Sequence, residues 1–460
     1  MDGKIKILFY NLDGAGVNYF RTQTPAMELE RNHSDKFYVE INPQIDFNDP
    51  SFVDYLKTFH IIHYHRQFLS DTQQMLKLAK ELKETGTTLI VDIDDYWELH
   101  KDHPFYIMGK ERQMHIPIQE NLKIADYVTT TTDIFANEIK KITGRDNVGV
   151  FYNSIDPTWM KQFQDNWQPD PDGLIRITYM AGSSHMVDIQ QLESVVNVLQ
   201  GDSETRDKFK IIIAGWDTEG KTTDFTFNQD FKVELERLGL WKHEVVKAIN
   251  KYRGNVDMIP DIPENIKEKY RDNVFSQEQR DIKSEESIYL TYEKILTDNH
   301  RLIQNQDYLQ WLMNFERNVK YEDEGNFGRR WTQKANTYAK VLDETDIALA
   351  PLADNAFNRM KSNLKQVECW SRKIPIVCSD IPPYNVHGKH MENCVLIPNK
   401  KNAHKYWKKY LKRLILDADL RKKLGEQLYE DFKTEYNLAD VTAKRAAFYE
   451  SVVAKTLELS

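Results

Sequence analysis

The sequence has few cysteines and no long apolar run, and each shortage excludes a class of protein. Its three cysteines, Cys369, Cys378 and Cys394, are too few and too unevenly spaced for a disulfide framework or a zinc site. We therefore expect a reducing, cytoplasmic compartment. No run of about 18 apolar residues occurs, so we expect no membrane span. The short apolar run at residues 4–10 ends in a glycine loop, which predicts a first strand rather than a signal peptide.

A net positive charge is also missing. The chain has 62 Lys and Arg against 71 Asp and Glu, for a net charge of −9. A general affinity for nucleic acid is therefore not expected, although a local basic surface can exist on an acidic protein. The 460 residues, 40% of them hydrophobic, are enough for two or three domains with real cores.

The first part of the chain alternates regularly between apolar strands and amphipathic helices. Such alternation predicts a doubly wound parallel sheet. We expect strands at residues 4–10, 60–64, 88–93, 127–130 and 148–152, with helices at 24–31, 72–85, 118–125 and 134–142.

A second α/β series follows a Pro- and Asp-rich linker at residues 153–173. Residues 217–331 interrupt it with a highly charged, mainly helical pattern in which no strand is convincing. This insertion could be a lid, an acceptor platform or a homo-oligomer interface, or it could simply pack on its host domain. The series comprises 175–181, 189–199, 210–215 and 338–398, followed by helices at 404–417, 420–435 and 441–457.

The most informative stretch is residues 346–384, DIALAPLADNAFNRMKSNLKQVECWSRKIPIVCSDIPPY. It reads as strand, loop, helix and strand, with the helix starting near Lys361. Lys361, Lys365 and Glu368 are then spaced to share one helical face. A solvated charged face is the simple alternative. Ligands bind at the carboxyl ends of parallel strands, however, so the two lysines and the amides near Ser362 could hold a diphosphate. Glu368 could accept hydrogen bonds from sugar hydroxyls.

Two glycine-containing loops follow the first strand of each half. Gly14 and Gly16 permit close approach of a ligand to the backbone, and Arg21 could meet a phosphate. In the second half, MAGSSHMVD places Gly182, Ser183 and His185 in the same position. An ordinary turn and a serine helix cap are the alternatives to ligand binding at these two loops.

Two further clusters end strands of the first half. His63 and His65 could hold a metal, but a polar strand end lining the cleft is the favoured interpretation. Asp92 and Asp94 resemble a metal-binding DxD pair. We favour a metal-free role in which one carboxylate caps the next segment and the other orients a neighbouring side chain.

These elements, in this order, resemble the group 1 family of retaining glycosyltransferases with the GT-B fold. The resemblance rests on the glycine loop with Arg21 and Pro25, on NSID at 153–156, on GSSHMVD and, above all, on residues 346–384. Their helix matches the FNxxKSxLKxxE pattern of a phage and bacterial branch. The resemblance covers most of the chain outside the insertion.

The resemblance implies an α/β protein with two Rossmann-like domains facing a cleft. The acceptor domain would be 1–156, joined by the C-terminal helix 438–460. The donor domain would be 172–437, with 217–331 inserted. The enzyme would move a sugar from a nucleoside diphosphate sugar to an acceptor with retention at the anomeric carbon. It would work in the cytoplasm, which is the host cytoplasm if the chain is phage-encoded.

The resemblance also assigns residues. Glu368 matches the second of two family glutamates and would bind the ribose, whereas the first falls at Met360. Sugar contacts must therefore differ here, or activity is lost. The other candidates are our own inference from charge and position and are not family assignments. The candidate catalytic residues are Lys361, Lys365, Arg21 and Asp94, and the donor-binding candidates are Gly14, Gly16, Gly182, Ser183, His185, Arg330, Ser362 and Glu368.

Family members generally need no cofactor beyond the nucleotide sugar, and no divalent metal. The acceptor could be a glycan, a small molecule, a protein or a modified DNA base, and the basic stretch at 405–413 favours DNA while the net charge opposes it. Met360 motivates an alternative, a non-catalytic nucleotide-sugar-binding or assembly protein. A phosphorylase or epimerase on the same fold is less expected.

Overall fold

The computed structural model describes most of both α/β series. Its described residues are 3–11, 16–43, 45–47, 49, 51–103, 105–156, 173–182, 185–218, 221–251, 256–271, 273–281, 296, 326–332 and 338–459. Of the predicted site residues, Gly14 and Ser183 lie outside this set.

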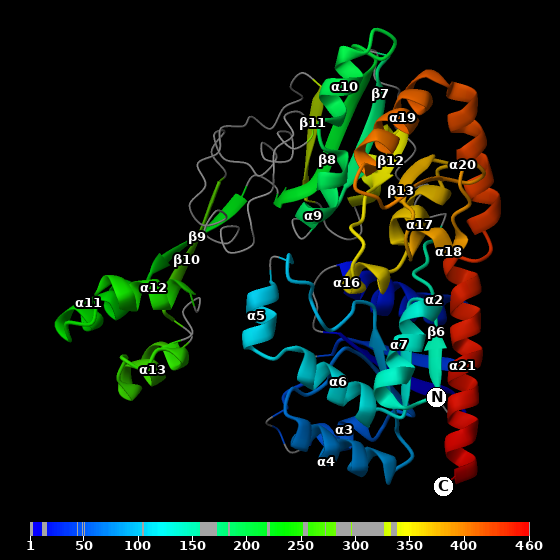
Figure 1. Ribbon diagram of the computed structural model, residues 1–460. Helices are drawn as coiled ribbons and strands as arrows, with labels where there is room; N and C mark the ends of the chain where they lie inside the picture. Colours follow the sequence, from blue (N-terminus) through cyan, green and yellow to red (C-terminus); the bar gives the residue numbers. More distant parts are fainter. Residues whose placement is uncertain are drawn as a thin grey trace.

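The first domain is a six-stranded parallel sheet in the order β2-β1-β3-β4-β5-β6, with helices on both faces (Figure 1). The five predicted strands are confirmed. Edge strand β2 was missed because its single partner leaves it half exposed, so it lacks a continuous apolar pattern. The strands are β1 (Ile5–Tyr10), β2 (Phe37–Ile41), β3 (Ile61–His65), β4 (Thr88–Ile93), β5 (Tyr127–Thr130) and β6 (Val148–Val150). The helices include α1 (Gly16–Asn18), α2 (Thr24–Asn32), α3 (Phe52–Leu56), α4 (Thr72–Lys83), α5 (Tyr106–Glu111), α6 (His115–Ile124) and α7 (Asp133–Thr143), with a π-helical turn η1 (Tyr19–Gln23).

The second domain repeats this architecture. Its six parallel strands are ordered β11-β8-β7-β12-β13-β14. They are β7 (Ile175–Met180), β8 (Phe209–Thr218), β11 (Phe327–Thr332), β12 (Ile347–Ala350), β13 (Ile376–Ser379) and β14 (Val395–Ile397). The helices include α9 (Met186–Ile189), α10 (Val195–Gly201), α16 (Ala356–Arg359), α17 (Leu364–Trp370), α18 (Tyr384–His387), α19 (Ala403–Leu416) and α20 (Ala418–Phe432), with short 3-10 helices η3 (Gln190–Leu192) and η5 (Tyr338–Glu344).

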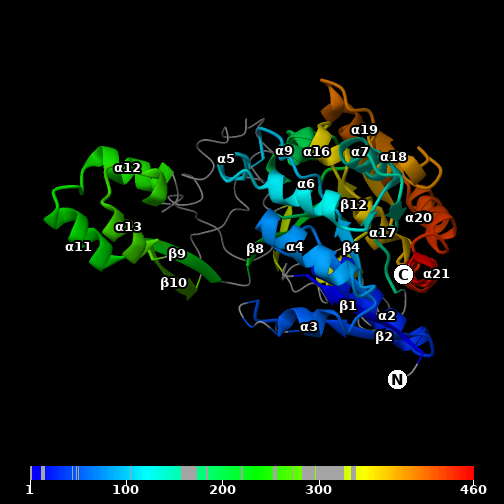
Figure 2. The same cartoon turned by 90° about the horizontal axis from the view of Figure 1, so that it is seen from below.

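The expectation that residues 217–331 contain no strand is wrong. β9 (Lys221–Phe227) and β10 (Phe275–Asp281) pair antiparallel, and β11 is an edge strand of the second sheet. Charged residues in all three strands hide the apolar pattern that the sequence reading relied on. Among the described residues of this insertion, the helical pattern is represented by α11 (Gln229–Arg237), α12 (His243–Lys251) and α13 (Glu264–Tyr270). They form a small core of their own and project away from both sheets (Figures 1 and 2).

The single helix expected to start near Lys361 is also wrong, because the segment forms two short helices. α16 begins after Asn355, whose side chain accepts a 2.8 Å hydrogen bond from the Asn358 amide. It ends at Arg359, and α17 starts only at Leu364. Lys361 therefore lies in the turn between the helices and does not share a helical face with Lys365 and Glu368.

The chain crosses between the domains twice, and the two crossings are hydrogen-bonded together. The Ile155 amide donates to the Tyr436 carbonyl at 3.1 Å, and the Leu438 amide donates to the Ile155 carbonyl at 2.9 Å. The long helix α21 (Leu438–Leu459) then returns to the first domain, where it packs beside α2 (Figure 1). Among the described residues, no helix has the length and apolarity needed to cross a membrane.

Candidate functional site

The turn between α16 and α17 contacts the first domain through two adjacent residues. The Lys361 Nζ lies 3.6 Å from the Asp95 Oδ1, just beyond the carboxyl end of β4. The Asn153 side-chain amide donates a 2.8 Å hydrogen bond to the Ser362 Oγ. The predicted donor turn therefore lies at the junction of the two domains, next to strand ends of both sheets.

Glu368 is the most constrained carboxylate of this region. It is 1% exposed, and its Oε1 accepts a 2.7 Å hydrogen bond from the Tyr338 hydroxyl. Its Oε2 pairs with the Lys365 Nζ at 2.9 Å. Burial, reinforced by this carboxylate, raises the pKa of Tyr338 well above its ordinary value, so the phenol keeps its proton and remains a donor. Lys365 and Glu368, both predicted from sequence, are thus brought together.

Lys361 also lies against an aromatic group and two histidines that the sequence reading missed. Its ammonium stands 4.7 Å from the centre of the Phe357 ring. The same ring is 5.4 Å from the His103 ring and 6.2 Å from the His100 ring. Burial, together with the nearby Lys361 charge, lowers the pKa of both histidines, that of His103 to about 4. Both imidazoles are therefore neutral near pH 7. The occurrence of two histidines a few residues after the acidic end of β4 is the sequence feature that could have identified them.

The loop after β7, which contains Gly182, is connected through Asp188 to α16 and to the loop before it. Its Oδ2 lies 2.7 Å from the His185 Nδ1, while its Oδ1 accepts from the Ala353 amide at 2.6 Å and from the Asn358 side chain at 3.0 Å. His185, predicted from sequence, is thus held toward the loop that leads into α16. Gly182 is the second residue after β7.

Arg21 points inward instead of toward a ligand space. Its guanidinium donates to both Asp92 oxygens, at 2.6 and 2.9 Å, and to the Phe151 carbonyl at 2.6 Å. A weaker bond reaches the Asn153 side chain at 3.2 Å. Burial alone would raise the pKa of Asp92, but the Arg21 charge and hydrogen bonds lower it overall. An expected phosphate contact would require Arg21 to leave all of these partners, which argues against that role.

The remaining polar strand ends are also occupied by protein groups. Asp94 lies 2.8 Å from the His65 Nε2 and 3.3 Å from an Arg66 nitrogen. His63 lies within 3.2 Å of the Thr129 and Tyr449 hydroxyls. In the part of the chain that the structure describes, no three His, Cys, Asp or Glu side chains gather as a metal site. A metal-free mechanism remains a prediction.

Two predicted donor residues lie at the margins of this site. Arg330 on β11 makes a two-point ion pair with Glu344, at 2.7 and 2.8 Å. Gly16 starts α1, next to the residues that are not described. Met360, which stands where the family that the sequence resembles has a glutamate, packs against the hydrophobic core of the first domain.

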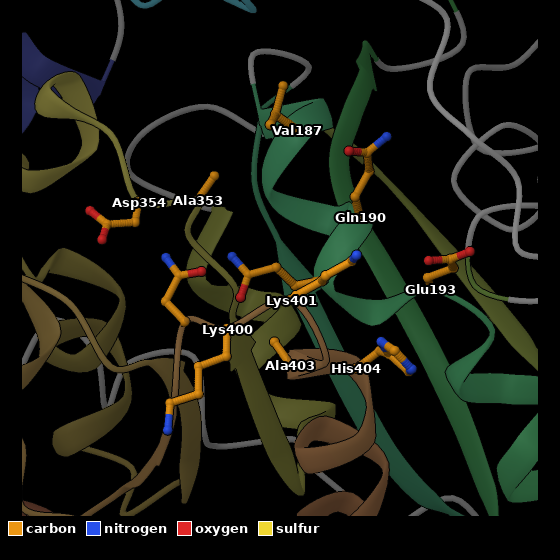
Figure 3. Close-up of a pocket in the computed structure, with 11 residues that line it drawn as sticks. Val187, Gln190, Glu193, Ala353, Asp354, Lys400, Lys401, Ala403 and His404 are labelled. Carbon is orange, nitrogen blue, oxygen red and sulfur yellow. The ribbon is translucent and has the colours of Figure 1, made fainter.

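A separate open pocket of about 620 Å³ lies on the second domain, between α9, η3 and the start of α19 (Figure 3). Its lining is mostly polar. Lys401 extends over the pocket, whereas Lys400 points away from it. The other lining residues are Val187, Gln190, Gln191, Glu193, Ala353, Asp354, Asn399, Ala403 and His404.

No family model and no curated protein matches the sequence. Solved structures do match over nearly the whole chain. HepE from Anabaena, in complex with UDP, is 11% identical with a TM-score of 0.51, covering 97% of this chain and 100% of that one. Sucrose-phosphate synthase from Thermosynechococcus elongatus is 10% identical with a TM-score of 0.54, covering 98% and 100%. A glycosyltransferase from Rickettsia africae is 10% identical with a TM-score of 0.53, covering 98% and 99%. At such identities the likeness shows the fold, so the expected two-domain GT-B fold is confirmed.

Proposed function

We propose that the chain transfers a sugar from a nucleoside diphosphate sugar to an acceptor, with retention at the anomeric carbon. The observation that carries this proposal is the position of Lys361, which belongs to the second domain but lies 3.6 Å from Asp95 of the first. It lies in the turn that leads into α17, the helix that carries the Lys365–Glu368 pair. The HepE structures with the same fold hold UDP and UDP-glucose, which supports a donor of this class.

The chemistry follows from charge. Breaking a sugar–phosphate bond builds negative charge on the departing diphosphate, and fixed cations stabilise that charge most in the transition state. Lys361 and Lys365 are the cations that we assign to this role. Each currently pairs with a carboxylate, Asp95 and Glu368, so both side chains are already held near the junction. Ser362 adds a hydroxyl beside them.

The sugar itself would meet neutral polar groups. His100 and His103 are uncharged near pH 7, and a neutral imidazole offers one donor and one acceptor to sugar hydroxyls. They take over contacts that Met360 cannot make. Glu368 would accept a hydrogen bond from the ribose, as the resemblance implies, while Tyr338 and Lys365 hold its carboxylate in place.

Arg21 receives a positioning role in this proposal. It connects Asp92 to Asn153, and Asn153 in turn holds Ser362. A continuous set of hydrogen bonds thus runs from the core of the first domain to the donor turn of the second. Asp94 likewise orients His65 instead of touching a substrate.

The test starts with a thermal-shift screen of UDP-, GDP-, ADP- and CMP-sugars, because a ligand that binds only the folded state raises its stability. The nucleotide that shifts melting is then used to measure diphosphate release, and NMR of the product reads the anomeric configuration. Glu368→Ala should abolish the shift. Lys422→Ala, an exposed lysine on α20, serves as the control. An inverted product would overturn retention, and the absence of any shift would overturn the proposed donor class.

Met360 favours a second candidate, a nucleotide-sugar-binding protein without transferase activity. Its side chain packs on the first domain's core where family enzymes have a glutamate. If a nucleotide sugar raises the melting temperature but is neither hydrolysed nor transferred, this candidate replaces the first.

A further inference from the structure

Helix α19 presents a row of exposed cations on one face. Lys405, Lys409 and Arg413 are all exposed and each is four residues from the next. With a rise of about 1.5 Å per residue, neighbouring members lie about 6 Å apart along the axis. Lys401, also exposed, extends this cationic row just before the helix begins.

No salt bridge of the described chain engages the cationic row, although the Lys409 ammonium stands 5.3 Å from the centre of the Tyr410 ring. Neighbouring basic residues are occupied: Lys408 binds the Ser194 hydroxyl at 3.0 Å, and Lys412 pairs with Asp202 and Glu204. No carboxylate of the described residues forms an ion pair with the cationic row. The helix is anchored by its opposite, apolar face, where Trp407, Leu411 and Leu414 are buried.

The charge of this region is opposite to that of the whole protein. Residues 400–423 contain ten lysines and arginines against two aspartates, in a chain of net charge −9. Concentrated unpaired cations on an acidic protein carry a cost in self-repulsion that an anionic partner removes.

We propose that α19 binds the phosphate backbone of duplex nucleic acid through this cationic row. A series of separate cations suits a series of separate phosphates better than it suits one small anion. Single strands are bound largely by stacking on exposed aromatics, but the two tyrosines of α19, Tyr406 and Tyr410, are half-buried, and Tyr410 is hydrogen-bonded to His390. An amphipathic helix that lies in a membrane surface buries large apolar side chains alongside its cations, and of the described residues of α19 only Leu416 qualifies as an exposed large apolar side chain.

The position of the cationic row determines from which side a bound duplex would approach the domain junction. Its end at Lys401 overlies the pocket of Figure 3, which Ala353 and Asp354 also line. These two residues belong to the loop between β12 and α16, and that loop leads to Phe357 beside Lys361. A duplex on α19 would therefore approach the domain junction from the second domain.

The test is fluorescence anisotropy of the full chain with a labelled DNA duplex of about 20 base pairs, without any sugar nucleotide, across about 50–200 mM salt. Four phosphate contacts predict a slope of log K against log salt of about −3.6. The variant Lys405→Gln/Lys409→Gln/Arg413→Gln should bind more weakly and lose about 2.7 of that slope. The control is Lys77→Gln/Lys80→Gln/Lys83→Gln, which removes the same charge from exposed positions on α4 and should keep the wild-type slope.

Each other outcome overturns the proposal. Absence of duplex binding at the lowest salt does so, and so does an equal loss of affinity in the α4 control, which would mean that net charge alone is measured. Binding to anionic lipid vesicles but not to the duplex would replace nucleic acid by a membrane. Melting curves of both variants show that they remain folded. Because no donor is present, the result is independent of the proposed transferase activity.

Discussion

The Lys361 ammonium lies 3.6 Å from the Asp95 carboxylate, and this contact joins the turn between α16 and α17 in the second domain to the end of β4 in the first. The same ammonium stands over the Phe357 ring, next to two neutral histidines. A diphosphate entering the junction would compete with Asp95 for this cation.

Substitutions of the two partners should therefore act in opposite directions. Lys361→Ala removes a cation from the leaving group and should lower kcat by about 100-fold, the effect typical of one lost transition-state contact. Asp95→Asn frees Lys361 and should tighten donor binding by up to about 1 kcal/mol, because the pair is partly exposed. Calorimetric titration of the donor and initial rates check both. Weaker donor binding by Asp95→Asn would mean that the carboxylate itself contacts the donor.

The Tyr338 hydroxyl should matter for stability as well as for binding. Tyr338→Phe leaves one oxygen of the buried Glu368 without its donor, which costs about 1–3 kcal/mol of unfolding free energy. Urea denaturation measures this loss, and donor affinity should fall with it as Glu368 moves. Tyr38→Phe is the matched control, because Tyr38 bonds Glu40 in an exposed setting and its loss should change little. Equal effects of the two variants would contradict the assignment.

Much of the fold could be read from the sequence because its strands are buried and nearly continuous in apolar residues. β4 and β5 occupy the predicted residues. The break between α16 and α17 could not be read, because distant partners set it. Asn358 bonds Asp188, and Asn363 bonds the Tyr436 hydroxyl at 2.7 Å. Neither partner is evident from local propensity.

The site was predicted less well for the same reason. Lys361, Lys365 and Glu368 were predicted because they are polar residues between two buried strands, and the structure brings Lys365 and Glu368 together. The inward direction of Arg21 depends on Asp92, which is 71 residues away and follows no local pattern. His100 and His103 become part of the junction only through Phe357 of the other domain.

The buried pair of Arg21 and Asp92 should make a large contribution that depends on both partners. The side chains are 1% and 2% exposed, so Arg21→Met leaves an uncompensated buried carboxylate and should cost about 3–5 kcal/mol. The double variant Arg21→Met/Asp92→Leu removes both charges and should regain part of that loss. Arg271→Met, which breaks an exposed pair with Asp257, should cost at most about 1 kcal/mol. Urea denaturation compares all three, and a double variant less stable than Arg21→Met would contradict the argument.

His63 should make the free energy of unfolding depend on pH in the mildly acidic range. Burial lowers its pKa from 6.5 to about 3, so the folded protein keeps it neutral while the unfolded chain takes up a proton below about pH 6.5. Stability is therefore full above that pH and falls as the pH drops, by at most about 1.4 kcal/mol per pH unit for each such histidine. His103, with a pKa lowered to about 4, adds to the slope.

Asp92 acts in another pH range. Its pKa is lowered, so its contribution is lost only below the unfolded carboxyl value of about 3.9. Denaturation between about pH 4.5 and pH 7 thus isolates the histidines. His63→Asn should flatten the dependence there, the exposed His243→Asn should leave it unchanged, and an unaltered slope in His63→Asn would show that His63 is not the titrating group.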